Sequence, residues 1–406
     1  MYQIFGNSFV RHMSFVWIST RKRLNTRQLC RQTNRVIKSH VSVFAKSSPL
    51  MLSLMWWTNK DKPLDENSFM SQTITPFNEL IANESDMKSK FELFVMKVQK
   101  EVCLELQKVE DKEHLIDTQV DGQNQSVKFK VDRWTRAEGG GGVTCVLEDG
   151  QVFEKAGVNI SVVYGKLPTP AAQQMRSRGK TLKENADLKF FACGVSSVIH
   201  PRNPNVPTLH FNYRYFEVED VTNNEKHWWF GGGTDMTPYI LNENDCIHFH
   251  KTLKNSCDKH NKDYYPKFKK WCDDYFFINH RKECRGIGGL FFDDMDYPNQ
   301  KDSFEFVKSC ADSITTCYIP VVNNNVTKGY SYADRQWQLL RRGRYVEFNL
   351  IYDRGTKFGL FTPGARYESI LMSLPLVAKW QYCHSPEPNS KEDKLIQILK
   401  TPRDWV

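Results

Sequence analysis

The sequence predicts an α+β fold, in which helices interrupt and flank an antiparallel sheet, from the order of two kinds of periodicity. Apolar residues first recur every three or four positions, as on one face of a long helix: Met87, Phe91, Phe94, Val98, Val102, Leu106 and Val109. The period then changes to two at Val127, Phe129 and Val131, as in a strand. Strand-like runs continue at 142–149, 157–164, 192–199, 208–218 and 227–230. Short connections between several of them favour antiparallel hairpins over parallel crossovers.

Helical patterns dominate the rest of the chain and indicate layers that cover the sheet. They lie at about 245–260, 266–284, 302–317, 331–342 and 366–380. Two further strands are expected between them, at 289–293 and 345–351. No Pro-, Gly- or Ser-rich linker divides 86–406, so this region is predicted to be a single domain. A polar linker at 61–85 and a basic leader at 1–60 precede it.

The net charge of +9 is concentrated in the leader. Residues 1–60 contain ten Lys and Arg but no Asp or Glu, which leaves 46 basic against 47 acidic residues in the rest of the chain. Because phosphate binding requires a basic face, a nearly neutral body argues against nucleic acid as a partner. A local basic pocket for a small acidic ligand is still compatible with this balance.

The composition of the leader, rich in Arg and Ser with scattered apolar residues, is typical of mitochondrial transit peptides. A basic tail without a targeting role is the alternative. The apolar patch 50–57 that follows is a candidate signal for the intermembrane space. It is much shorter than the roughly 20 residues that span a bilayer. We therefore expect no transmembrane segment, while a peripheral association with a membrane stays open.

Cysteine and histidine spacings give no sign of a metal site. The eleven cysteines form no CxxC pair, which disfavours a structural zinc site and predicts mostly free, buried thiols. There is no HExxH motif, and His248 and His250 are two positions apart on a predicted helix, so their side chains point to different sides. The sequence therefore predicts no bound metal.

The strand at 208–216 carries a row of polar side chains. Because alternate residues of a strand share a face, His210, Asn212 and Arg214 point one way and the intervening aromatic residues, including Tyr213, point the other. By the same rule Ser196, Val198 and His200 share one face of the preceding strand, and a hairpin would bring the two rows together. A solvated sheet face is the simpler interpretation. A binding site is the alternative, since the row combines a titratable group, an amide and an arginine.

Two glycine runs, 139–142 and 231–233, match no nucleotide-binding loop. Each fits either a turn or bulge, or a close approach of backbone to a flat ligand. Asp235 follows the second run and an aromatic stretch, so it either caps a turn or lies near a ring-shaped ligand. Further along, Thr362 and Pro363 are typical of a helix start, and Arg366 near that start either binds a carboxylate or is solvated.

Nine ordered segments give these isolated signals a common interpretation. They read RAEGGGGV (136–143), FEKAGVN (153–159), GVSSVIHP (194–201), HFNYRYFE (210–217), WWFGGGTD (228–235), RGIGGLFFDD (285–294), RRGRYVEFNL (341–350), ESILMSLP (368–375) and PRDWV (402–406). Together they resemble the oxygen-dependent coproporphyrinogen-III oxidases, and the similarity covers about residues 75–406. The resemblance implies a large flat antiparallel sheet flanked by helices on both faces, and a homodimer.

The resemblance also implies an activity and assigns roles to residues. The activity is the conversion of coproporphyrinogen III to protoporphyrinogen IX, with O2 as co-substrate, no cofactor, and CO2 and H2O2 as products. His210 matches the proton donor of the family pattern, and Asp235 matches an acid that engages the pyrrole N–H groups. Substrate contacts fall on Ser196, Asn212, Tyr213, Arg214, Gly364, Ala365 and Arg366. Tyr213 has the wrong parity for a side-chain contact, so its backbone is expected to serve, and Ala365 replaces a frequent serine.

Two rival functions fit some of the same residues. A protein that only carries a tetrapyrrole would share the fold, although the combination of His210, Asp235 and two arginines favours an enzyme. A metal-assisted oxidase is the second rival, because some bacterial members of the family are described with four histidine ligands. Their positions match His200, His210, His250 and His280.

Overall fold

The computed structural model describes residues 65–121, 126–177, 179–183, 186–361 and 364–406. From Asp65 onward the chain forms one compact unit. The leader expected at 1–60 lies outside the described residues, and its targeting role stays a prediction. Within the part that is described, no helix is long and apolar enough to cross a membrane. Every described cysteine is a free thiol, and all but Cys383 are buried, as predicted.

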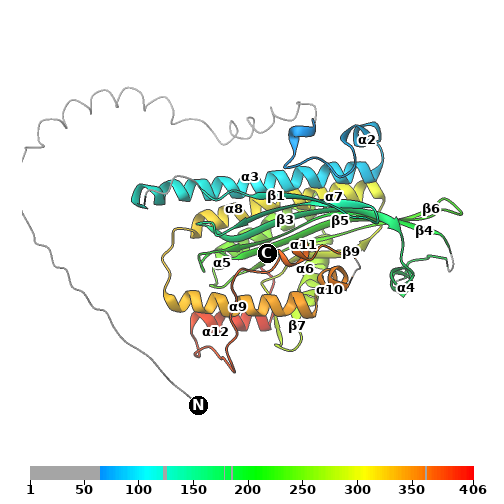
Figure 1. The fold of residues 1–406 in the computed structure, drawn as a ribbon. Helices are drawn as coiled ribbons and strands as arrows, with labels where there is room; N and C mark the ends of the chain where they lie inside the picture. Colours follow the sequence, from blue (N-terminus) through cyan, green and yellow to red (C-terminus); the bar gives the residue numbers. More distant parts are fainter. Residues whose placement is uncertain (1–64, 122–125, 178, 184–185, 362–363) are drawn as a thin grey trace, which may run out of the picture. The chain divides into compact units, whose positions relative to one another are not determined.

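A seven-stranded sheet forms the centre of the unit and confirms the predicted α+β class (Figure 1). Its order is β1-β2-β3-β4-β5-β6-β9, and every neighbouring pair is antiparallel. The bounds are β1 Lys130–Thr135, β2 Gly140–Glu148, β3 Phe153–Lys166, β4 Leu188–Pro201, β5 Thr208–Asp220, β6 Glu225–Thr237 and β9 Gly289–Met295. A separate two-stranded ribbon pairs β7 (Phe277–Ile278) with β8 (Glu283–Cys284). β2 to β6 and β9 overlap the predicted strands, whereas the strand expected from Val127 onward begins only at Lys130.

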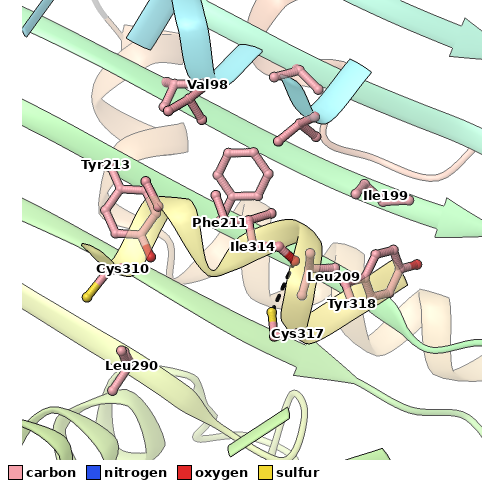
Figure 2. Packing of buried hydrophobic residues seen from close by; sticks show 14 of the residues in the cluster. Val98, Ile199, Leu209, Phe211, Tyr213, Leu290, Cys310, Ile314, Cys317 and Tyr318 are labelled. Atoms are coloured by element: carbon pink, nitrogen blue, oxygen red, sulfur yellow. Dashed lines mark hydrogen bonds between the residues drawn. The ribbon is translucent and has the colours of Figure 1, made fainter. Parts of the chain in front are cut away.

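One face of the sheet is buried beneath α3 (Met87–Asp121), α5 (Glu243–Asp258), α6 (Tyr264–Tyr275), α7 (Gln300–Asp312) and α8 (Ile314–Asn325). Leu209, Phe211 and Tyr213 of β5 point into this core and are fully buried. Figure 2 shows Val98 of α3 and Ile314 of α8 around Phe211. The alternate residues of β5, His210, Asn212 and Arg214, therefore face the other side of the sheet, as predicted.

The second face is covered by α9 (Tyr332–Ile351), α10 (Arg354–Phe361) and α11 (Tyr367–Leu371), and α12 (Lys391–Lys400) packs against α9 (Figure 1). A 2.9 Å hydrogen bond joins Ser369 Oγ of α11 to Thr144 Oγ1 of β2. Met372 lies directly over β3, because a Cβ added at Gly157 would meet its sulfur at 2.3 Å. Helices thus flank both faces of the sheet, as predicted.

Several predicted elements in the C-terminal half are wrong in type or length, and one helix was missed. The strand expected at 345–351 is the last part of α9, where Tyr345 and Phe348 are buried on one helical face three positions apart. The helix expected at 266–284 ends at Tyr275, and the β7–β8 ribbon follows. The helix expected at 366–380 is only Tyr367–Leu371, and α10 was not predicted. Thr362 and Pro363, the expected helix start, lie outside the described residues.

The described part of the segment expected to be a linker contributes to the body. It carries a 3-10 helix, η2 (Glu66–Ser68), and a short helix, α2 (Phe77–Ala82). Phe69 is buried in the main core. The carboxylate of Glu92 on α3 accepts hydrogen bonds from the backbone N–H groups of Ile74 and Thr75, each 2.9 Å long. These contacts attach the segment to α3.

Candidate active site

A straight row of polar side chains crosses the second face of the sheet. Asp132, Thr144, Asn159, Ser196 and Asn212 lie on five successive strands, and each is the direct cross-strand partner of the next. Because directly paired residues share a face, all five side chains point to the same side. Neighbouring strands are about 4.8 Å apart, so the row spans about 19 Å from β1 to β5. This register confirms that the polar rows of β4 and β5 come together, and it pairs Ser196 with Asn212.

A second row contains the ionisable centre of the face. Val198, His210 and Asp235 are successive cross-strand partners on β4, β5 and β6. His210 Nδ1 lies 2.7 Å from Asp235 Oδ1. Arg285, in the segment between β8 and β9, donates from Nη2 to both oxygens of Asp235 at 2.9 and 2.8 Å. Asp235 and Arg285 are each 2% exposed, whereas the His210 side chain is 21% exposed.

The pKa values of this group follow from its pairing. Burial alone would raise the pKa of Asp235, but Arg285 and His210 outweigh it and hold that pKa below the ordinary range. Burial opposes the charge of Arg285, and Asp235 again outweighs it, so the pKa of the guanidinium is raised. Asp235 is therefore an ionised carboxylate in a buried, fully paired environment.

An aromatic box fixes the guanidinium of Arg285. Its central carbon lies 4.0 Å from the ring centroid of Phe276, 4.5 Å from that of Tyr345 and 4.9 Å from that of Phe348. Nη1 donates to Asn349 Oδ1 at 3.0 Å. The box is built by α9 and by the residue that follows α6, so two helices determine where Arg285 points.

Arg214 stands on the same face, two residues beyond Asn212. Its Nη1 donates to Asn212 Oδ1 at 2.7 Å, and its Nη2 pairs with Asp293 Oδ1 at 2.9 Å. Asp293 also pairs with Arg354 at 3.2 Å. Burial would lower the pKa of Arg214, but Asp293 raises it. Gly231, the cross-strand partner of Arg214, leaves the space for this pair, because a Cβ there would lie 2.7 Å from Arg214 Nη2.

Arg366 lies toward the other end of the polar row. It is the N-cap residue of α11 without a side-chain cap hydrogen bond, and it pairs with Asp132 of β1. A cavity of about 430 Å³ beside this pair is lined by Lys130, Lys155 and Met372 among others. Gly364 has φ +72°, in the left-handed region that favours glycine, and Ala365 is half-buried. The face therefore carries Arg214 and Arg366 about four strands apart.

Comparison with known proteins identifies the family of the chain. The model of the coproporphyrinogen III oxidase family matches residues 90–405. The chain belongs to this family. It is 60% identical over 343 residues to an oxygen-dependent coproporphyrinogen-III oxidase of Drosophila melanogaster, with 84% of each chain covered. It is 58% identical over 341 residues to the human mitochondrial enzyme of that name, covering 84% of this chain and 72% of the relative. A chloroplastic coproporphyrinogen-III oxidase 1 of Arabidopsis thaliana is 46% identical over 354 residues, with 86% of each covered.

The remaining residues that the family resemblance singled out are placed as follows. Tyr213 points into the core, where its hydroxyl lies 2.6 Å from Thr234 Oγ1, so only its backbone belongs to the polar face. In the first glycine run, Gly139 and Gly140 adopt positive φ at the β1–β2 turn. A Cβ at Gly142 would lie 2.3 Å from the indole of Trp134. This run accommodates the protein's own turn and indole, which favours the structural interpretation.

The four histidines of the metal alternative have separate partners. His200 bonds the carbonyl of Ser373 at 2.9 Å, and His280 pairs with Glu347 at 2.7 Å. His250 is fully buried, its Nε2 lies 3.1 Å from the carbonyl oxygen of Ile287, and burial lowers its pKa to about 3. Among the residues that the structure describes, no group of three or more His, Cys, Asp or Glu side chains is arranged to hold a metal ion.

Sequence reasoning missed the partners that complete the site. Arg285, Asp293, Arg354 and Asp132 were not proposed as site residues, although each is paired with a predicted one or with its partner. Arg285 and Asp293 both lie in the 285–294 segment that carried part of the family resemblance. That motif was the available signal. No sequence signal pointed to Asp132, because a single acidic residue on an edge strand is typical of a solvated face.

Proposed function

We propose that this protein is an oxygen-dependent coproporphyrinogen-III oxidase, which converts two propionate side chains of coproporphyrinogen III to vinyl groups in porphyrin and haem biosynthesis. Each propionate carboxylate reacts with one O2 and one proton and yields the vinyl group, CO2 and H2O2. The observation that carries the proposal is a buried carboxylate–histidine pair between two arginines on one face of the sheet, in a member of the coproporphyrinogen III oxidase family.

Arg214 and Arg366 hold the substrate through its carboxylates. A porphyrinogen carries four propionates around a broad macrocycle, and the polar row between the two arginines spans about 19 Å. Arginine is permanently charged and binds carboxylates in a fork, so it suits recognition rather than proton transfer. A hydrogen bond to a charged group contributes about 1.5–3 kcal/mol.

Smaller contacts complete the substrate face. Ser196 and Asn212 offer a hydroxyl and an amide at the β4–β5 end of the polar row. Tyr213, Gly364 and Ala365 contribute through their backbones: the side chain of Tyr213 is in the core and the other two carry no polar side-chain atom. These groups orient the macrocycle, which brings one propionate at a time to the reacting position.

His210 and Asp235 handle the protons. Histidine titrates near neutral pH and can both give and take a proton, while an ionised carboxylate stabilises positive charge that develops nearby. An electron-rich pyrrole reacts with O2 by itself, so the protein's task is to orient the ring and to manage protons. The decisive experiment compares aerobic with anaerobic turnover of purified protein, with CO2 release as the readout. Aerobic binding of substrate without CO2 release would instead identify a tetrapyrrole carrier.

We propose that no metal or organic cofactor is required. The support is that each histidine of the alternative ligand set is engaged by another protein group, as described above for His200, His250 and His280. Enzyme treated with a chelator and checked by metal analysis should keep its full turnover. Inactivation that one specific ion reverses would overturn this proposal.

We propose that the protein is a homodimer whose contact includes part of the segment 345–380. This segment carries exposed apolar side chains, among them Phe361 at 84% and Tyr367 at 55% exposure. Several exposed apolar side chains on one segment are typical of a protein interface, and a second copy of the chain is the simplest occupant. Light scattering of purified protein that begins at Asp65 should give a dimer at micromolar concentration. A monomer alone would count against the proposed homodimer.

We propose that the protein acts in mitochondria, in the intermembrane space. The support is the acid-free leader with its apolar patch, together with the mitochondrial names of the human and mouse relatives. A variant that begins at Asp65 should keep turnover and lose import, because Phe69 and the rest of the core stay intact. A folded variant of this length without turnover would contradict the dispensable role of the leader.

A further inference from the structure

Both carboxylate oxygens of Asp235 are occupied by protein groups. Oδ1 is shared by His210 Nδ1 at 2.7 Å and Arg285 Nη2 at 2.9 Å, and Oδ2 lies 2.8 Å from the same Nη2. Only 2% of the Asp235 side chain is exposed, against 21% for His210. Of the three groups, the imidazole is the one that reaches the open side of the face, and Nε2 is the ring nitrogen not bonded to Asp235.

We infer that Arg285 and Asp235 are positioning residues that act on the substrate through His210, whose Nε2 is the atom that exchanges protons with it. The inference rests on the proposed function and changes the expected role of Asp235. A carboxylate whose two oxygens already accept charged donors in a buried site is not placed to accept pyrrole N–H groups as well.

The geometry explains how such a unit would work. The ionised Asp235 accepts from His210 Nδ1–H, which fixes the ring orientation and leaves Nε2 for the substrate. Arg285 supplies the opposite charge that makes burial of this carboxylate tolerable, because an unpaired buried charge is strongly destabilising. The aromatic box and Asn349 keep the guanidinium in place, so Arg285 sets the position of Asp235 and, through it, the position of His210.

The electrostatic surroundings make the inference measurable. The titratable groups that face Asp235 and Arg285 are Tyr345 of α9, Asp353 next to α9 and Cys272 of α6, and the β4 partner of His210 is the apolar Val198. Among the charges that lower the pKa of Asp235, Arg285 has the largest effect and His210 follows it. If the charge of Arg285 is removed, the full charge of Asp235 acts on the imidazole and favours its protonated form.

The first test is the titration of His210 followed by NMR in histidine-labelled protein, with His210→Gln used to assign the signal. In Arg285→Gln the midpoint should move upward by about one pH unit, and the acidic limb of the pH profile of kcat should move with it. Arg285→Lys keeps the charge and should restore a midpoint near that of the wild type. An unchanged midpoint in Arg285→Gln would overturn the inference.

A matched control separates the role in positioning from damage to the fold. Arg342 is likewise buried and pairs with a carboxylate, Glu154, which also retains a second cationic partner, Arg335. Arg342→Gln should therefore cost similar stability but leave the His210 midpoint where it is. A shift of equal size in both variants would assign the effect to general loosening and contradict a specific role of Arg285.

The second test is a double-mutant cycle that does not depend on whether Arg285 variants fold. If Asp235 acts only through His210, Asp235→Asn should slow the wild type steeply but change kcat of the His210→Gln enzyme by less than about threefold. Losses that multiply would mean that Asp235 meets the substrate directly. The wild type reports separately on the proposed function, since absence of aerobic CO2 release there would refute the activity while the NMR result still stands.

Discussion

Gly231 controls the position of Arg214, and replacing it by alanine tests whether Arg214 holds a substrate carboxylate. A Cβ at position 231 would lie 2.7 Å from Arg214 Nη2 and 2.7 Å from Asp293 Oδ1. Both contacts are closer than van der Waals separation allows, so one or both side chains must move. The atoms in question are the ends of flexible side chains rather than backbone, and the sheet itself should tolerate the change.

The size of the effect follows from what Arg214 loses. Its ion pair with Asp293 at 2.9 Å and its hydrogen bond to Asn212 at 2.7 Å hold the guanidinium beside the β5 end of the polar row. A displaced guanidinium forfeits a charge-assisted hydrogen bond to a propionate, which is about 1.5–3 kcal/mol. At about 1.4 kcal/mol for each factor of ten, KM should rise roughly 10- to 150-fold. Stability should change little, because alanine is no worse than glycine in a strand.

The assay is steady-state CO2 release as a function of substrate concentration, with thermal unfolding measured on the same samples. Gly329→Ala is the matched control, since a Cβ at Gly329 meets no atom within 4 Å and should leave KM unchanged. A normal KM in folded Gly231→Ala would refute the reasoning that Arg214 binds the substrate from this position. A loss of stability comparable to a core mutation would show that the sheet, and not the side chain, absorbs the clash.

Three further changes have defined outcomes. Arg366→Ala should weaken binding of a tetracarboxylate porphyrin more than that of a dicarboxylate, as measured by the two dissociation constants; equal weakening would contradict a carboxylate role. Burial opposes the charge of Glu347, but Arg281 and His280 lower its pKa from 4.5 to about 2. Glu347 therefore stabilises the fold above about pH 4.5 and loses this effect as the pH falls toward 2, so Glu347→Gln should flatten acid unfolding in that window. Glu110→Ala should lower the free energy of unfolding by about 1–3 kcal/mol, measured by chemical denaturation, because it leaves the buried N–H groups of Val152 and Phe153 without their acceptor. Glu101→Ala, at a half-exposed position of the same helix, is the control and should change it little.

The sequence predicted the parts of the site that depend on a single strand. The alternation in β5 placed His210, Asn212 and Arg214 on one face and Tyr213 in the core, and the structure confirms this. Alternation is a local property, and one register shift would have moved every side chain to the other face. The meeting of the polar rows of β4 and β5 was also predicted, because a short hairpin connection brings these strands together.

Short apolar segments that are buried on more than one side were harder to assign to a helix or a strand. The stretch Tyr345–Ile351 alternates enough to resemble a strand, yet it continues α9, because Tyr345 and Phe348 pack on one helical face beneath the site. A short apolar run does not distinguish a buried strand from a buried helix. This error has a functional side, since the same two rings form the box around Arg285.

Arg285 shows most clearly why the rest of the site was not predictable. Apart from the family motif at 285–294, nothing in its sequence distinguishes it from the other arginines, and its environment comes from three other segments. β6 supplies Asp235, the residue after α6 supplies Phe276, and α9 supplies Asn349. Burying a charge requires all of its partners at once, so a fully buried arginine marks a place where the tertiary structure is tightly specified. The buried partners lie behind His210, and the imidazole alone of the three groups reaches the open face. This arrangement is the strongest physical reason to assign proton exchange to His210 and a positioning role to Asp235 and Arg285.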